Sequence, residues 1–206
     1  MTDSLAKRET TPKSTSGRTA GNFLRRLFAV PELGVLVPLI LFIIVFYMIN
    51  STFLSSGNLA AMVRAMSFIG VIAMGQTFLL ISGAFDLSVG SVAGLSAIIC
   101  SAAMVRYEWP IWAAVLAGLS TGAVTGLINS FVVLKLGVPA FIATLGMLNI
   151  AKGVNYLISK GYTIYPLPDA VNKFGTAEPL GTSWSFVIFI ILAIIAAFIL
   201  GKTAYG

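Results

Sequence analysis

One acidic residue, Asp86, stands within an otherwise uncharged apolar stretch that covers residues 65–105. A carboxylate inside a membrane is costly, and by default such a residue marks a functional site. Asp is also a favoured helix N-cap, and Asp86 follows Ser82 and Gly83 where one helix should end and the next should begin. The two interpretations are compatible, because one residue can cap a helix and line a pathway together.

Three amides also lie inside apolar stretches: Gln76, Asn129 and Asn149. Within a membrane such amides hydrogen-bond between helices or face a polar cavity, and we favour the first role for these three. Lys152 lies near the middle of its apolar stretch, where its amine reaches the interface only with difficulty. It therefore needs a partner or a wet cavity, and Asp86 is one candidate partner.

Glycines recur every four residues in two places, at Gly90 and Gly94 and again at Gly118, Gly122 and Gly126. Four residues are about one helical turn, so each set lies on one helix face. Small residues on one face let two helices approach closely. The two sets therefore predict helix packing rather than chemistry.

The sequence holds no histidine and a single cysteine, Cys100. The common nucleophilic triads, histidine metal sites and an internal disulfide are therefore excluded. No Walker A loop is present to bind nucleotide phosphates, and no paired carboxylates are arranged for hydrolysis. We expect no catalytic residue, cofactor or metal on this chain, so any energy source must be a partner or an ion gradient.

The composition of the 206 residues is 58% hydrophobic and 10% charged, against about 25% charged in soluble domains. This excludes an ordinary soluble globule and an intrinsically disordered chain. The net charge is +6, and half of it comes from residues 1–32, which hold six Lys or Arg and three Asp or Glu. We interpret this segment as a flexible basic tail rather than a face that binds nucleic acid.

The remaining sequence is a series of long apolar stretches. The stretch over 65–105 is about twice the roughly 20 residues that one helix needs to cross a bilayer, so it must form two spans. Long stretches without strict alternation are helices rather than barrel strands. The sequence thus predicts an all-α, polytopic integral membrane helix bundle of about six transmembrane helices, at residues 33–49, 65–83, 87–105, 111–134, 138–159 and 184–200.

Six spans place both ends of the chain on one side of the membrane. Arg25 and Arg26 in the tail favour the cytoplasm as that side. Tyr and Trp residues then gather near the outer boundary, as in an aromatic belt. The one long loop, over residues 160–183, falls outside and is either functional or a passive connector.

Two segments carry a family resemblance. Residues 75–91 read GQTFLLISGAFDLSVGS, and residues 137–153 read GVPAFIATLGMLNIAKG. Both resemble segments of the permease subunits of bacterial ABC importers for simple sugars, of the ribose, xylose and arabinose type. Ala84 and Phe85 replace the usual Gly-Ile, and Lys152 replaces the usual Arg. The resemblance extends over about residues 33–206.

The resemblance implies a transport subunit, not an enzyme, in the bacterial inner membrane with a cytoplasmic N-terminus. It would pair as a homodimer within membrane lipid and receive solute from a periplasmic solute-binding protein. A separate cytoplasmic ABC ATPase would drive transport, which would proceed by alternating access. Pathway or signature residues would be Gln76, Asp86, Leu87, Ser88, Gly90, Ser91 and Asn129. The loop facing the binding protein would contain Tyr162, Asp169, Lys173 and Glu178.

Members of that family continue beyond a lead-in that Lys202–Gly206 matches, so we expect the chain to be an N-terminal portion of a permease, truncated before the ATPase-docking loop. Other hypotheses remain. The solute of an ABC importer could be a nucleoside, a signalling sugar derivative or a branched-chain amino acid. Asp86 and Lys152 could form the charge relay of an ion-gradient transporter or channel. A membrane-embedded enzyme is the weakest alternative.

Overall fold

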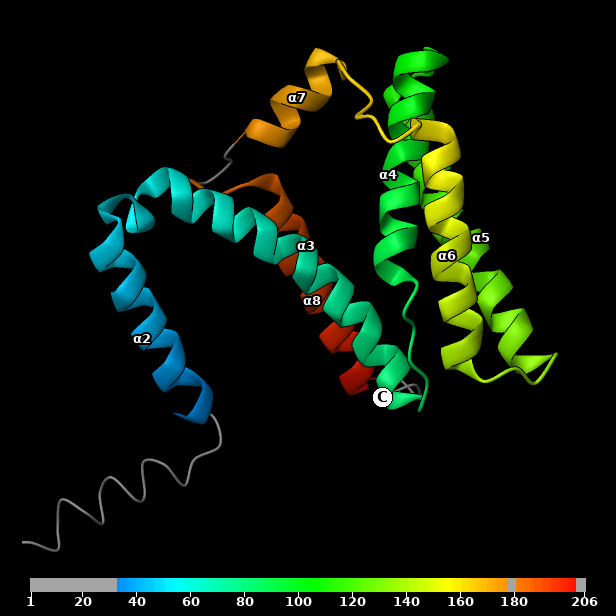
Figure 1. The fold of residues 1–206 in the computed structure, drawn as a ribbon, viewed down its shortest axis with the longest axis horizontal. Helices are drawn as coiled ribbons and strands as arrows, with labels where there is room; N and C mark the ends of the chain where they lie inside the picture. The colour runs from blue at the N-terminus through cyan, green and yellow to red at the C-terminus, as the bar shows by residue number, and fades with distance from the viewer. Residues whose placement is uncertain (1–32, 178–180, 203–206) are drawn as a thin grey trace, which may run out of the picture. The chain divides into compact units, whose positions relative to one another are not determined.

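The computed structural model describes residues 33–177 and 181–202, and the tail predicted over residues 1–32 lies outside them. Within these two ranges the regular structure is helical, with no strand. The elements in chain order are α2 (Leu33–Ile49), η1 (Ser51–Leu54), α3 (Ser56–Ile81), α4 (Val89–Arg106), α5 (Ile111–Leu134), α6 (Ala140–Ser159), α7 (Asp169–Thr176) and α8 (Trp184–Lys202) (Figure 1).

Five of the described helices are long and apolar enough to cross a membrane: α3, α4, α5, α6 and α8. The 17-residue α2 is apolar as well, but at 1.5 Å per residue it extends roughly 26 Å, slightly less than a bilayer core of about 30 Å. The predicted all-α membrane fold is confirmed. It has five candidate spans and one shorter apolar helix where the sequence predicted about six spans.

Helix α3 differs most from the predicted spans. It begins at Ser56 and has 26 residues, whereas the sequence predicted a span starting at residue 65. The prediction took Arg64 as a boundary, but this side chain is half-buried in the middle of a continuous helix. A long cation can extend toward the interface along a helix without ending it.

The C-terminus of α3 depends on one glycine. Gly83 has a φ of +75°, a conformation that costs other L-residues roughly 1–2 kcal/mol. In this conformation the Gly83 N–H donates to the Leu80 carbonyl at 3.0 Å, and the Ala84 N–H donates to the Leu79 carbonyl at 2.9 Å. This is a Schellman motif, and it turns the chain out of the helix toward α4.

Helices α4, α5 and α6 pack side by side as a three-helix bundle (Figure 1). A Cβ atom at Gly118 on α5 would lie 3.1 Å from the Ser96 carbonyl oxygen and 3.3 Å from the Cys100 Cβ on α4. A Cβ atom at Gly94 on α4 would lie 3.5 Å from the Asn155 Nδ2 on α6. These two glycines allow the close helix approach that the spacing predicts.

The other three glycines of the two sets have open space around them. At Gly90, Gly122 and Gly126 an added Cβ atom would meet nothing within 4 Å. The predicted close approach is therefore not formed at these positions within the described chain. The spacing places the glycines on one helix face, but of these five only Gly118 lies so close to a neighbouring helix that a side chain would be crowded.

The long connection after α6 is packed on the bundle. Leu167, and Val171 on α7, contact the buried core that Ala103, Met104 and Ala114 form. The ring of Phe174 stacks on Trp184 with their centroids 5.4 Å apart. This connection is therefore fixed to α4 and to the start of α8 by apolar contacts.

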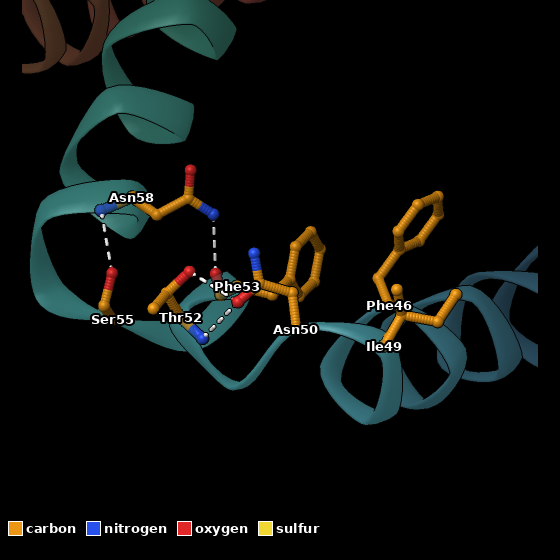
Figure 2. A pocket seen from close by; sticks show the side chains of 7 residues that line it. All are labelled: Phe46, Ile49, Asn50, Thr52, Phe53, Ser55 and Asn58. Atoms are coloured by element: carbon orange, nitrogen blue, oxygen red, sulfur yellow. Dashed lines mark hydrogen bonds between the residues drawn. The ribbon is translucent and has the colours of Figure 1, made fainter.

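Contacts divide the chain into two units, residues 1–58 and 59–206. In the first unit, the Asn50 Oδ1 accepts hydrogen bonds from the N–H and the hydroxyl of Thr52 at 3.0 and 2.7 Å (Figure 2). The Asn58 Nδ2 donates to the Phe53 carbonyl at 2.6 Å, and the rings of Phe46 and Phe53 stack. These contacts form the turn from α2 into α3 around a hollow of about 420 Å³.

Gly118 and Gly122 provide a matched test of packing, because they lie one turn apart on α5. We expect Gly118→Leu to lower the free energy of unfolding by about 1–3 kcal/mol, since the side chain would overpack against α4. Gly122→Leu enters open space and should change it by less than about 0.5 kcal/mol. The measurement is an SDS titration of the purified chain in detergent, followed by circular dichroism. Equal losses for both variants would contradict the α4–α5 contact.

Candidate functional site

The non-helical connection between α3 and α4 is organised around the Asp86 carboxylate. Its Oδ1 accepts hydrogen bonds from the backbone N–H and from the hydroxyl of Ser88, both at 2.6 Å. Ser88 is 0% exposed and is the N-cap residue of α4. Ser88 itself has helical dihedral angles and makes no side-chain cap hydrogen bond. The Asp86 carboxylate makes that bond instead, because it accepts from the Ser88 N–H at the start of the helix.

Gln76 joins α3 to this connection. Its Nε2 donates a hydrogen bond to the backbone carbonyl of Asp86. Its Oε1 is buried and has no hydrogen-bond partner within the described residues. Gln76 therefore holds the backbone of the acidic residue whose side chain bonds to Ser88.

Asn129 joins α5 to the same group of residues. Its Nδ2 donates to the Ser88 Oγ at 3.1 Å, and the residue is only 8% exposed. One continuous chain of hydrogen bonds therefore runs from Gln76 through Asp86 and Ser88 to Asn129. Four residues singled out from the sequence come together here, from α3, the connection and α5. We call them the polar chain.

A cavity of about 270 Å³ lies beside the polar chain, at the end of the bundle where α4 and α6 begin and α5 ends. Asp86 and Asn129 line it, and so does Gly126. Because nothing stands within 4 Å of a Cβ atom at Gly126, the absence of a side chain there leaves this space open. Its lining residues are Leu79, Ser82, Ala84, Phe85, Asp86, Gly126, Asn129, Ser130, Val133, Leu134, Ala140 and Thr144.

The sequence analysis missed the hydroxyls at this cavity. Ser82, Ser130 and Thr144 all line it. Thr144 is 3% exposed and its hydroxyl donates to the Ala140 carbonyl within α6. Each of these residues is a common helix residue that can satisfy its own hydroxyl locally. Ser82 lies in the first resembled segment and Thr144 in the second, so the resemblance offered a signal for these two but none for Ser130.

Other candidate residues lie outside the polar chain. Leu87 and Ser91 are half-buried and Gly90 is exposed. Asn149 is exposed and bonds only to the Leu145 carbonyl of its own helix, so it does not join helices as predicted. Lys152 is exposed on α6.

The predicted pairing of Lys152 with Asp86 is absent from the described residues, in which Asp86 bonds to Ser88. In the loop predicted to face a binding protein, Tyr162, Asp169 and Lys173 are exposed, and Glu178 lies outside the described residues.

The chemistry of this site is that of binding. A carboxylate accepts up to four hydrogen bonds, and amides and hydroxyls both donate and accept. No group of three or more His, Cys, Asp or Glu that could hold a metal occurs within residues 33–177 and 181–202. The cavity therefore offers a small molecule one carboxylate, one amide and three hydroxyls within a wall that is otherwise apolar.

Residues 58–206 match the family model described as the branched-chain amino acid transport system / permease component. The chain is 30% identical over 189 residues to the fructose import permease of Rhizobium meliloti, covering 87% of this chain and 52% of that protein. It is 34% identical over 174 residues to the ribose import permease of Haemophilus influenzae, covering 82% and 54%.

The chain is also 31% identical over 159 residues to the autoinducer 2 import system permease of Salmonella paratyphi B, covering 77% and 45%. It thus spans about half the length of these curated relatives. No solved structure matches the chain.

The hydrogen bond between Asn129 and Ser88 can be measured by a double-mutant cycle. With Ser88→Ala and Asn129→Ala we expect a coupling energy of about 0.6 kcal/mol, because hydrogen bonds between membrane helices average this value. The free energies come from SDS titration in detergent. The control cycle pairs Asn129→Ala with Ser91→Ala, one turn further along α4, and should give no coupling. Equal coupling in the two cycles would show that Asn129 does not act through Ser88.

Proposed function

This chain belongs to the permease family that residues 58–206 match, and we propose that it forms the membrane-spanning part of an ABC importer for a simple sugar. Its relatives include import permeases named for fructose and ribose. Five candidate spans and the polar cavity support a transport role for the chain. The single observation that carries the proposal is the polar chain, because it places a carboxylate, amides and hydroxyls beside a cavity within a membrane protein.

The mechanism we propose is alternating access without covalent chemistry on this chain. The helices would rock around the path, and the polar chain would hold the α3–α4 connection as part of its wall. Asp86 and Asn129 line the cavity, so the hydroxyls of a sugar would exchange hydrogen bonds with water for bonds to these groups. Gln76 and Ser88 would position Asp86, and Leu87, Gly90 and Ser91 would belong to the surrounding signature segment.

The proposal includes partners. ATP hydrolysis would take place on a separate cytoplasmic ABC ATPase, since no Walker A loop occurs in this sequence. The chain would pair with a second copy in the lipid of the inner membrane, with its N-terminus in the cytoplasm. A periplasmic solute-binding protein would meet the connection after α6, where Tyr162, Asp169 and Lys173 are exposed.

A second candidate solute is a branched-chain amino acid, because the matched family is described by that solute. The relatives favour the sugar, because they include import permeases named for fructose and ribose. The cavity itself offers both apolar contacts, from residues such as Phe85 and Val133, and hydrogen bonds from Asp86 and Asn129. An ion-gradient transporter using Asp86 and Lys152 is a further alternative, although these two residues form no ion pair in the described structure.

Uptake in the native host tests the proposal. Deleting the gene should abolish accumulation of radiolabelled ribose or fructose and leave leucine uptake unchanged. Asp86→Ala should reduce sugar uptake by about tenfold, because a charged acceptor of two hydrogen bonds is lost. Glu108→Gln, at an exposed acid outside the cavity, is the matched control and should transport normally at equal protein level.

The energy source separates the alternatives. Sugar uptake should stop when cellular ATP is depleted and should persist with a protonophore when ATP is maintained. Loss of leucine uptake alone on deletion of the gene would replace the sugar with an amino acid. Uptake that a protonophore abolishes at constant ATP would contradict the ABC mechanism.

A further inference from the structure

A second cavity, of about 240 Å³, opens among α4, α5 and α6 at the opposite end of the bundle, where α4 and α6 end. Its walls are apolar, with Ile99, Ala102 and Ala103 on α4 and Ala117 on α5. The space exists because three of these side chains are alanine. Trp109, in the turn after α4, forms part of the rim. We call this space the alanine crevice.

The cationic side chain of Arg106 lies near the end of the crevice. On α4, Ile99, Ala102 and Ala103 precede Arg106 at helical spacing, so the four residues share one face. The Arg106 Nη1 donates a hydrogen bond to the carbonyl of Ile158, a crevice residue on α6, at 2.7 Å. This bond uses one of the five N–H donors of the guanidinium, and Arg106 is exposed.

Charged residues of both signs lie near Arg106. Lys160, the C-cap residue of α6, follows Ile158 by two positions and is exposed. Glu108 follows Arg106 by two positions, and Asp169 lines a hollow together with Met104 and Val105, the two residues before Arg106. No ion pair joins Arg106 to Glu108 within the described part of the chain. A guanidinium fork matches the geometry of a phosphate group.

We propose that the alanine crevice binds one acyl chain of an anionic phospholipid whose phosphate is held by Arg106. The helical walls of the crevice offer a ligand only alanine and isoleucine side chains, so its occupant must be hydrocarbon where it lies against them. Its rim carries Trp109 and Tyr107, the residue types that gather at the level of lipid headgroups. An anionic headgroup complements Arg106 and Lys160, whereas a zwitterionic headgroup brings its own cation to the same place. The crevice is remote from the polar chain, so this inference does not depend on the proposed transport function.

Fluorescence quenching tests the proposal on the full chain in phosphatidylcholine vesicles. Trp112→Phe and Trp184→Phe leave Trp109 as the single tryptophan, because the sequence contains three. Phosphatidylglycerol with brominated acyl chains should quench Trp109 at about fivefold lower mole fraction than brominated phosphatidylcholine, the effect of one cation near an anionic lipid.

Variants assign the two parts of the site. Arg106→Gln should remove the preference for phosphatidylglycerol, and Lys135→Gln, an exposed cation at the other end of the bundle, should retain it. Ala102→Leu should fill the crevice and suppress quenching by both lipids. Ala117→Leu fills the crevice from the opposite wall. It replaces Ala102→Leu in the test if that variant loses its helical circular dichroism signal and is therefore unfolded. Ala97→Leu, exposed on another face of α4, is the matched control and should leave quenching unchanged.

Three results would overturn the proposal. Equal quenching by the two brominated lipids would indicate ordinary boundary lipid, without selection by charge. A preference that survives Arg106→Gln would remove the assigned phosphate ligand. No quenching by either lipid, or quenching that both filled variants retain, would show that the acyl chain does not enter the crevice and that another occupant covers it.

Discussion

A polar group inside a membrane must find its hydrogen-bond partner within the protein, because hydrocarbon offers none. The non-helical connection from α3 to α4 is the place where this chain meets that requirement. Gly83 closes the end of α3, Asp86 accepts from Ser88 at the start of α4, and Gln76 holds the carbonyl of Asp86. Asn129 then ties the connection to α5. The position of the connection, and of the cavity beside it, follows from this pairing.

The small residues of α5 show how one sequence feature takes on different roles. Gly118 allows α5 to approach the backbone of α4, whereas Gly126, two turns later, leaves the cavity beside the polar chain open. The backbone of α4 lies against the first glycine, whereas nothing lies within 4 Å of a Cβ atom at the second. The same bundle can therefore be tightly packed at one level and accessible to a small molecule at another.

The two ends of the α4–α6 bundle differ in how far their charged side chains are buried. At one end the Asp86 carboxylate is half-buried and held by neighbouring donors. At the other end Arg106 stays exposed and bonds to a helix-terminal carbonyl, beside walls made of alanine. The first arrangement suits a polar solute within the protein, and the second suits a molecule that is itself part hydrocarbon and part charge.

Sequence alone determined the all-helical membrane fold, because a stretch of about 20 apolar residues has few alternatives to a membrane-spanning helix. It also singled out Gln76, Asp86 and Asn129 as polar residues in such stretches, and Ser88 through the family resemblance. It could not determine which of them meet, because contacts between residues such as Ser88 and Asn129 depend on how helices pack. It also did not show that α3 extends back to Ser56, and it suggested a pairing of Asp86 with Lys152 that the described residues do not form. Tertiary structure decided these points, because the direction of each helix face is fixed only when the helices pack.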